Sequence, residues 1–495
     1  MIKKTYILFI FLAFLFFTTR VLNLKNIPIF TDEAIYIRWA QIALKDPTNR
    51  FISLEDGKQP LFIWLAAVSN KFISDPLIAT RLVSIFSGFG SLIGIYLLGK
   101  ELFSKKVGII SSVLYLILPF TLLYDRIALY DSFLTMLGIY SLLFTVRLVK
   151  VPDLSTAFLA AFSIGSAMIT KSSGNFFLYL IPFSALLFNF NNKNSKNLFF
   201  KWVLLSTTVG VISLLIYNML RLSPLFYIIE RKNLEFIRPL SDVLKNPSLF
   251  TVSNFKALFS WIAVYETYPF FLLSVFGLLY GIIKKNLSVL LIAVYIFAPF
   301  FAEVFFNKVL YPRFTLFYFP YFIILAAFAI SVLLAIYKKY QTFIYASLIL
   351  ATLIPLYYAT ILLTKPEKAP IPKSDSNQYF NDWPAGFGVE QVKDFLKEKS
   401  KNEKVTVGTQ GTFGLLPYGL QIYFPDNKNL HIEGFWPVDE KKLPQQILDA
   451  SQNNITYFIF NEYQGEILNP RLLFVAKYRK GIGNSYMRLY EVKSY

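Results

Sequence analysis

Two adjacent carboxylates stand in an otherwise apolar and aromatic stretch near the start of the chain, Ile27-Pro-Ile-Phe-Thr-Asp-Glu-Ala-Ile-Tyr36. A charged carboxylate in apolar surroundings is costly, so Asp32 and Glu33 are candidates for general acid–base catalysis. Their oxygens are also of the kind that hold a divalent metal ion, although nothing in the sequence demands one. The structural alternative is that Thr31 or Asp32 caps the start of a short helix.

Positively charged side chains recur in later gaps between apolar blocks. Lys58 stands in the turn Asp56-Gly-Lys-Gln-Pro-Leu61, and a point positive charge there suits capture of a phosphate. Its alternative is snorkelling toward lipid headgroups. Arg126 and Asp131 share one short connection and could simply pair with each other. The candidate phosphate- or substrate-binding residues are Lys58, Arg126, Asp131, Lys171 and Arg313.

This combination of residues suits one reaction class. A carboxylate removes a proton from an acceptor hydroxyl while cations stabilise a departing phosphate. The donor that fits such a site at a membrane surface is a sugar on a polyprenyl phosphate, whose lipid tail lies between helices. A sugar nucleotide fits less well, because it is cytoplasmic and these groups are expected to face outward.

The elements that position these groups are apolar blocks of membrane-spanning length. Of 495 residues, 55% are hydrophobic, too many for a soluble protein to cover with polar surface. A helix of roughly 20 apolar residues crosses a hydrocarbon core of about 30 Å. The sequence therefore predicts a polytopic α-helical membrane protein with about 11 spans, at residues 5–22, 79–99, 107–124, 132–149, 155–170, 174–190, 202–220, 268–283, 287–304, 314–336 and 342–363.

The basic residues predict the orientation of these spans. Alternate connections are short and rich in Lys and Arg, as at Lys105-Lys106, Lys284-Lys285 and Lys338-Lys339, so they are expected to be cytoplasmic. The first apolar block is interpreted as a retained helix with a cytoplasmic N-terminus, since no signal-peptide cleavage pattern follows it. The candidate site residues then face outward, in a plasma membrane crossed many times.

The outward-facing segments are long. A first external loop covers about 23–78, a second covers 221–267, and the chain after Thr364 leaves the membrane. Within the first loop, the apolar stretch Gln59–Phe72 is expected to be a helix lying in the interface. The predicted domains are therefore a transmembrane domain, 1–364, and a soluble extracytoplasmic domain, 365–495.

The soluble domain has the pattern of a small α/β fold. Helices are expected at Val389–Lys399 and Leu443–Asn453, and strands at Val405–Gly408 and Ile455–Asn461. A hairpin of 472–479 and 485–492 is expected around Lys480-Gly481-Ile482-Gly483.

Composition excludes several other classes. There is no cysteine and only one histidine, His431, so disulfides, Cys nucleophiles and multi-His metal clusters are ruled out. The formal net charge of +19 lies in short gaps between spans and forms no basic stripe on a soluble module, so nucleic acid is not an expected partner. No glycine-rich nucleotide-binding motif occurs.

The ordered motifs resemble those of a known family. The pair Asp32-Glu33 outside the first helix, the Lys58-Gln-Pro-Leu61 turn, and the turn Arg126–Asp131 look like the dolichyl-phosphate-mannose–protein mannosyltransferases. They are closer still to the bacterial lipid A aminoarabinose transferases. Thr170-Lys171 and Tyr311-Pro-Arg-Phe314 also fit, and the resemblance covers about the first 330 residues. Many relatives have Pro-Pro where this chain has Gln59-Pro60.

The resemblance implies the C-type glycosyltransferase fold and an inverting transfer from a polyprenyl-phosphate-linked sugar to a protein, lipid or glycan acceptor. It implies that Asp32 is the catalytic carboxylate and Glu33 its helper. Lys58 would contact the donor phosphate, with Arg126 and Arg313 as further phosphate or sugar contacts. The alternative function is a transporter or flippase of lipid-linked sugars, but the expected spans are nearly free of charge in their middles.

Overall fold

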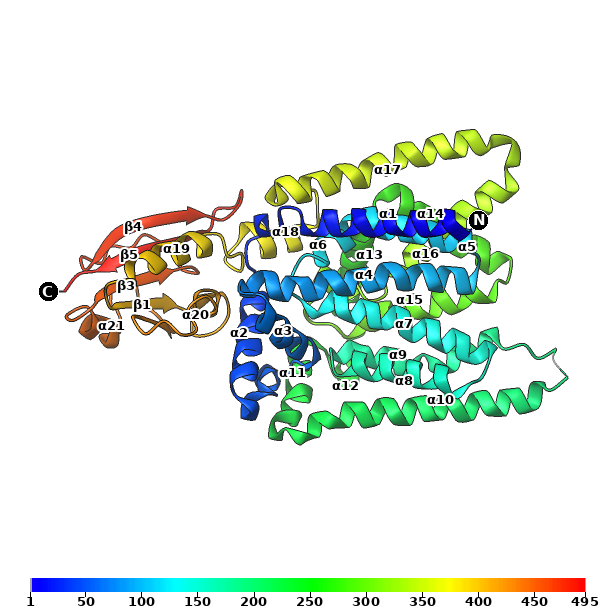
Figure 1. Ribbon diagram of the computed structural model, residues 1–495, viewed down its shortest axis with the longest axis horizontal. Coiled ribbons are helices and arrows are strands. Elements are labelled where there is room, and N and C mark those ends of the chain that lie inside the picture. Colours follow the sequence, from blue (N-terminus) through cyan, green and yellow to red (C-terminus); the bar gives the residue numbers. More distant parts are fainter. Residues whose placement is uncertain (1, 192, 495) are drawn as a thin grey trace. The chain divides into compact units, whose positions relative to one another are not determined.

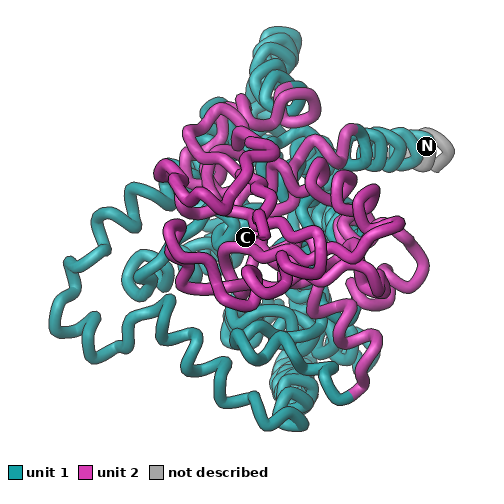
Figure 2. The backbone as a smooth tube through the Cα atoms, turned by 90° about the vertical axis from the view of Figure 1, so that its left-hand side faces the viewer, with its two compact units in different colours: residues 1–22, 48–65, 82–360 teal, residues 23–47, 66–81, 361–495 magenta. Residues whose placement is uncertain are grey.

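The protein is described by a computed structural model over residues 2–191 and 193–494. The chain packs into two compact units, each assembled from three stretches of sequence (Figure 2). Unit 1 comprises residues 1–22, 48–65 and 82–360, and unit 2 comprises 23–47, 66–81 and 361–495. By packing, the chain after residue 360 thus shares a unit with much of the first external loop. The predicted domains 1–364 and 365–495 stay a prediction about segments that fold independently.

Unit 1 is helical. Its helices are α1 (Ile2–Val21), α5 (Lys105–Ile117), α6 (Pro119–Tyr124), α7 (Tyr130–Lys150), α8 (Leu154–Met168), α9 (Asn175–Tyr179), α10 (Ser195–Asn218), α11 (Ile228–Phe236), α12 (Leu240–Lys245), α13 (Thr251–Glu266), α14 (Tyr268–Ile283), α15 (Leu287–Phe306) and α16 (Phe319–Ile336). Three helices contribute residues to both units: α3 (Leu61–Phe72), α4 (Pro76–Leu102) and α17 (Gln341–Thr364).

The long helices of unit 1 pack along their lengths. Helix α8 lies against α7 and α10, and α16 lies against α5 and α14 (Figure 1). A Cβ atom on Gly277 of α14 would stand only 2.4 Å from the carbonyl oxygen of Leu325 in α16. Such close backbone approach at a small residue is how helices associate in lipid, where apolar side chains gain nothing by leaving the solvent.

The structure is that of a multi-pass membrane protein, but it does not confirm the count of eleven spans. Among the described residues, seven helices are long and apolar enough to cross a membrane, and eight crossings result if α13 and α14, bent by 110°, form one span. Pro119 divides the predicted span 107–124 into α5 and α6, because the residue before a proline is disfavoured in a helix. Helix α8 has only 15 residues, fewer than the roughly 20 that an untilted crossing needs.

The predicted span 174–190 is also divided. It forms α9 and the 3-10 helix η5 (Ile181–Leu187), which has a proline in its first turn. Because the expected orientation was counted loop by loop over eleven spans, it stays a prediction.

Unit 2 contains a mixed five-stranded sheet of order β2-β1-β3-β5-β4. The central strand β1 pairs in parallel with β2 and β3, while β5 pairs antiparallel with β3 and β4. The strands are β1 (Val405–Gln410), β2 (Leu430–Phe435), β3 (Ile455–Phe460), β4 (Leu472–Arg479) and β5 (Tyr486–Val492). The helices are α2 (Thr31–Lys45), α18 (Lys373–Ser376), α19 (Val389–Lys399), α20 (Leu415–Gln421) and α21 (Gln445–Ala450).

The sequence located most of this sheet. Helix α19, strands β1 and β3 and the β4–β5 hairpin lie at their predicted positions, while β2 and α20 were not predicted. Alternate residues point to opposite faces of each strand, and each face has its own core. Helix α21 packs on one face through Ile447. On the other face, Val389 and Leu396 of α19 share a core with Ile29, Ala34 and Leu77. Part of the first external loop is therefore an integral part of the hydrophobic core of unit 2.

Candidate active site

The two predicted catalytic carboxylates lie in the first turn of α2, which begins at Thr31. Phe30 occupies the N-cap, so neither Thr31 nor Asp32 caps the helix. Instead, the backbone N–H of Phe30 donates to Glu33 Oε2 at 2.9 Å. Asp32 is partly exposed and Glu33 is fully buried. Negative charge in a first helical turn is stabilised by the helix dipole.

Glu33 forms a bidentate ion pair with Arg81 of α4. Arg81 Nε lies 2.8 Å from Glu33 Oε1 and Nη2 lies 2.8 Å from Oε2, with both side chains 0% exposed. The remaining guanidinium hydrogens go to the backbone carbonyls of Leu24, Ile27 and Pro28. The Glu33 carboxylate is thus held by Arg81 and by the N–H of Phe30, an arrangement that fixes the loop before Asp32.

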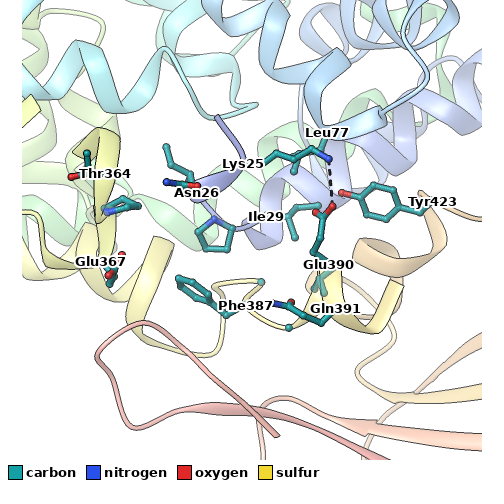
Figure 3. A pocket seen from close by; sticks show the side chains of 16 residues that line it. Lys25, Asn26, Ile29, Leu77, Thr364, Glu367, Phe387, Glu390, Gln391 and Tyr423 are labelled. Carbon is teal, nitrogen blue, oxygen red and sulfur yellow. Dashed lines mark hydrogen bonds and ion pairs between the residues drawn. The ribbon is translucent and has the colours of Figure 1, made fainter. Parts of the chain in front are cut away.

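A pocket of about 480 Å³ borders the same loop (Figure 3). Ile27, Pro28 and Phe387 give it apolar walls, and Asn26, Glu367 and Gln391 add polar groups. At its edge, Lys25 Nζ lies 2.8 Å from Asp75 and 3.4 Å from Glu390. The part of its lining that comes from this loop, residues 25–29, lies three to seven positions before Asp32 in the sequence.

Three predicted cation and carboxylate positions come together in unit 1. Lys171 Nζ lies 2.7 Å from Asp131 Oδ1. The same ammonium lies over the rings of Tyr130, at 5.0 Å from the centroid, and Phe314, at 4.6 Å. Arg313, next to Phe314 in the 3-10 helix η8 (Pro312–Thr315), lies over the ring of Tyr311 at 5.2 Å. Residues more than 100 positions apart therefore form one group of cations against aromatic faces.

Lys58 belongs to the same region of unit 1. Its ammonium lies 5.1 Å from the ring centroid of Phe236 at the end of α11. The next residue, Gln59, donates to Ser172 Oγ at 2.8 Å, and Ser172 follows Lys171 directly. Hydrogen bonding thus joins the Lys58 turn to the Lys171 corner.

Arg126 has a different setting. It is 0% exposed, and its guanidinium donates to the carbonyl oxygens of Arg20 at 3.2 Å and Leu22 at 2.7 Å. These carbonyls end α1, where cations stabilise the exposed backbone oxygens of a helix. Asp131 pairs with Lys171 at 2.7 Å, and the role of Arg126 as a phosphate or sugar contact stays a prediction.

Two further polar groups, one in each unit, were not among the residues that the sequence predicted. Glu303 of α15 is 7% exposed and accepts a hydrogen bond from Tyr318 Oη at 2.8 Å. Arg81 was likewise overlooked, because it lay inside the predicted span 79–99. Both are charged residues within a few positions of the end of a predicted apolar span, where a charge is costly and is often functional. This position in the sequence is the signal that could have identified them.

The use of a divalent metal ion stays a prediction for the part of the chain that the structure describes. There, no three carboxylate or histidine side chains are grouped closely enough to hold a metal ion. The cations offer a different capacity. A cation against an aromatic face remains attractive to anions, and Lys or Arg bound to a phosphate forms short charge-assisted hydrogen bonds.

Comparison with known proteins agrees with the motifs. Residues 57–220 match the family described as dolichyl-phosphate-mannose-protein mannosyltransferase, a stretch that contains Lys58, Arg126, Asp131 and Lys171. No curated protein matches the chain. The family resemblance predicted from the motifs is therefore confirmed over this stretch, which excludes Asp32, Glu33 and Arg313.

Solved structures extend the likeness to the whole fold. The apo crystal structure of ArnT from Cupriavidus metallidurans is similar over 99% of this chain and 98% of its own, with a TM-score of 0.60 and 13% identity. The same protein bound to undecaprenyl phosphate gives a TM-score of 0.55 at 12% identity, over 99% and 98% of the two chains. The Archaeoglobus fulgidus oligosaccharyltransferase gives 0.55 at 13% identity, over 92% of this chain and 67% of its own. The chain thus has the predicted C-type glycosyltransferase fold.

Proposed function

We propose that this protein is an integral membrane glycosyltransferase that moves a sugar from a polyprenyl-phosphate donor to an acceptor hydroxyl on the outer face of the membrane. The observation that carries the proposal is the cluster of Lys58, Lys171 and Arg313 against aromatic rings, the first two of which lie within the family match. One similar structure is bound to undecaprenyl phosphate, a lipid of the class that would carry the sugar.

The proposed reaction divides between two groups of residues. Asp32 accepts the proton of the acceptor hydroxyl while the oxygen of that hydroxyl forms a bond to the anomeric carbon. The bond from that carbon to the phosphate oxygen breaks with inversion, and the polyprenyl phosphate leaves with the electron pair. Lys58, Lys171 and Arg313 stabilise the charge that develops on this phosphate.

The remaining predicted residues act indirectly in this proposal. Asp131 orients Lys171 through their 2.7 Å ion pair. Glu33 and Arg81 position the start of α2, and Arg126 anchors the end of α1. The acceptor is a protein, a lipid or a cell-envelope glycan, and the outward orientation is part of the proposal.

The test is mass spectrometry of lipids and glycans from cells with and without the protein. A polyprenyl-phosphate sugar should accumulate and one glycosylated product should disappear in its absence. If the protein were a flippase, membranes that lack it would still form the glycosylated product when donor is supplied directly on the outer face. Supply of that donor to inverted and right-side-out vesicles separates the two outcomes.

Asp32→Asn tests the assigned base. General-base removal is expected to lower transfer about 10²- to 10⁴-fold while the melting temperature stays within about 2 °C of the wild type. Glu403→Gln, an exposed carboxylate of the same unit, is the matched control and should transfer normally. Near-normal turnover of Asp32→Asn would sink the catalytic assignment.

A further inference from the structure

The amine of Lys480 is buried at the turn between β4 and β5, with 0% of the residue exposed. It donates to the carbonyl oxygen of Trp383 at 2.8 Å, to Asn461 Oδ1 at 2.6 Å, and to the carbonyl oxygen of Ala385. An ammonium has three N–H donors, and each meets an oxygen here. A lysine removed this completely from water is rare unless its donors are satisfied.

The segment that Lys480 holds is also the segment that holds the start of α2. Pro384 lies between the two carbonyls bound by Lys480, and its own carbonyl accepts from Thr31 twice, from the backbone N–H at 3.2 Å and from Oγ1 at 3.1 Å. Residues 382–385 form a turn that is closed by the N–H of Ala385 donating to the carbonyl of Asp382 at 3.0 Å. One turn is therefore bound by Lys480 through the carbonyls of Trp383 and Ala385, and by Thr31 through the carbonyl of Pro384 between them.

Further contacts make this arrangement a short β-like pairing. Phe30 and Ala385 form an antiparallel bridge, and the N–H of Gly386 donates to the carbonyl of Ile29 at 2.7 Å. A Cβ atom at Gly386 would lie 2.4 Å from that same carbonyl oxygen, so only glycine permits the approach. The ring of Phe30 packs edge-on against Tyr379 at 4.8 Å.

We propose that Lys480 is a positioning residue for the transferase reaction: through residues 383–386 it fixes the backbone of Ile29–Thr31 and hence the carboxylate of Asp32. This inference rests on the proposed function, because it takes Asp32 as the reacting group. In this proposal the five-stranded sheet of unit 2 contributes to catalysis because it fixes the position of Ile29–Thr31. A displacement of about 1 Å at a reacting group can cost about 10²-fold in rate.

Hydrogen–deuterium exchange of the full-length protein tests the clamp without any substrate. In Lys480→Met, the amides of Thr31 and Gly386 should exchange at least about tenfold faster, while those of β1 and β3 keep wild-type rates. Lys477→Met, an exposed lysine of the same hairpin, is the control and should change neither region. Unchanged exchange at Thr31 and Gly386, or equal acceleration throughout the sheet, would overturn the clamp.

Turnover then tests the link to catalysis, with the donor that accumulates in cells lacking the protein. Lys480→Met should lower kcat about 10- to 100-fold with the donor KM within about threefold. In the Asp32→Asn background the same change should lower kcat no further, because both act through one carboxylate. Additive losses would overturn the positioning role.

Two outcomes keep this proposal separable from the proposed function. If Asp32→Asn is active while exchange at Thr31 still rises in Lys480→Met, the catalytic assignment fails and the clamp stands as a structural feature. If Lys480→Met does not fold, Thr31→Val replaces it: loss of the Oγ1 hydrogen bond to Pro384 should reduce kcat several-fold in the same direction. A fully active Thr31→Val would then overturn the inference.

Discussion

The ion pairs Arg81–Glu33 in unit 2 and Lys171–Asp131 in unit 1 join the same kinds of charge but are built differently. The first is bidentate, has both side chains 0% exposed, and uses its other donors on three backbone carbonyls. The second is a single contact at 2.7 Å, with the Lys171 side chain 16% exposed and its ammonium over two aromatic rings. The Arg81 guanidinium makes all of these hydrogen bonds with neighbouring parts of unit 2, so it fixes a loop. The Lys171 ammonium is partly exposed to solvent and lies against ring faces, so it can still bind an anion.

The largest effect should follow removal of the buried cation. Arg81→Met leaves the Glu33 carboxylate buried without its partner and three carbonyls without their donor, so unit 2 should lose about 3–5 kcal/mol of stability. Denaturant unfolding monitored by tryptophan fluorescence measures this loss. In Arg81→Met with Glu33→Leu, part of the loss should be recovered, because the unpaired charge is gone. A loss below about 1 kcal/mol in the single variant would contradict the role of this pair in fixing the loop before Asp32.

A second effect of intermediate size concerns pH. Burial lowers the pKa of Lys480 to about 7 from its ordinary 10.5, while Asp382 and Glu462 act in the opposite direction. Between these two values the unfolded chain binds a proton that the folded protein has released, so stability rises with pH from about 7 to 10.5, and below about 7 both states are protonated and the dependence ends. The stability gap between wild type and Lys480→Met should therefore widen by about 1–3 kcal/mol from pH 6.5 to pH 9.

The pH effect has a matched control in the same hairpin. Melting of Lys477→Met, whose side chain is exposed, should keep a constant offset from the wild type across this range. A gap between wild type and Lys480→Met that is constant or narrows toward pH 9 would show that burial does not govern this amine.

Lys171→Met should affect binding more than stability. Removal of the ammonium is expected to weaken binding of undecaprenyl phosphate about tenfold, with a loss of unfolding free energy near 1 kcal/mol. Titration of the purified protein with undecaprenyl phosphate measures this, and Lys256→Met, an exposed lysine of α13, is the control. Unchanged affinity together with a large loss of stability would make Lys171 a structural residue like Arg81.

The smallest effect belongs to an exposed pair of unit 2. Lys45 and Asp426 lie 2.7 Å apart, but their side chains are 55% and 81% exposed. Water and salt screen such a pair, so Lys45→Met should cost less than about 1 kcal/mol. A cost comparable with that of Arg81→Met would mean that burial does not separate the two kinds of ion pair.

The sequence predicted much of the fold and the cations of the candidate site. Apolar blocks indicated the membrane helices because a helix that crosses the hydrocarbon core needs a minimum length of apolar residues, which can be read directly from the sequence. Two of the predicted spans are not confirmed as single long helices, and prolines at 119 and 182 lie within them without reducing their hydrophobicity. Lys58, Lys171 and Arg313 were recognised from motif order, and the structure groups them on aromatic faces.

What the sequence by itself determined is local: helix-length apolar blocks, the strand periods of the soluble sheet, and charged residues at the borders of spans. Only the tertiary structure decided what each charge does. Glu33 meets Arg81 across 48 residues, and Lys480 binds the turn whose Pro384 carbonyl accepts from Thr31. Such partners are set by the packing of distant segments, and no local pattern records them. Two neighbouring carboxylates of similar appearance in the sequence, Asp32 and Glu33, therefore differ in exposure once the chain has folded.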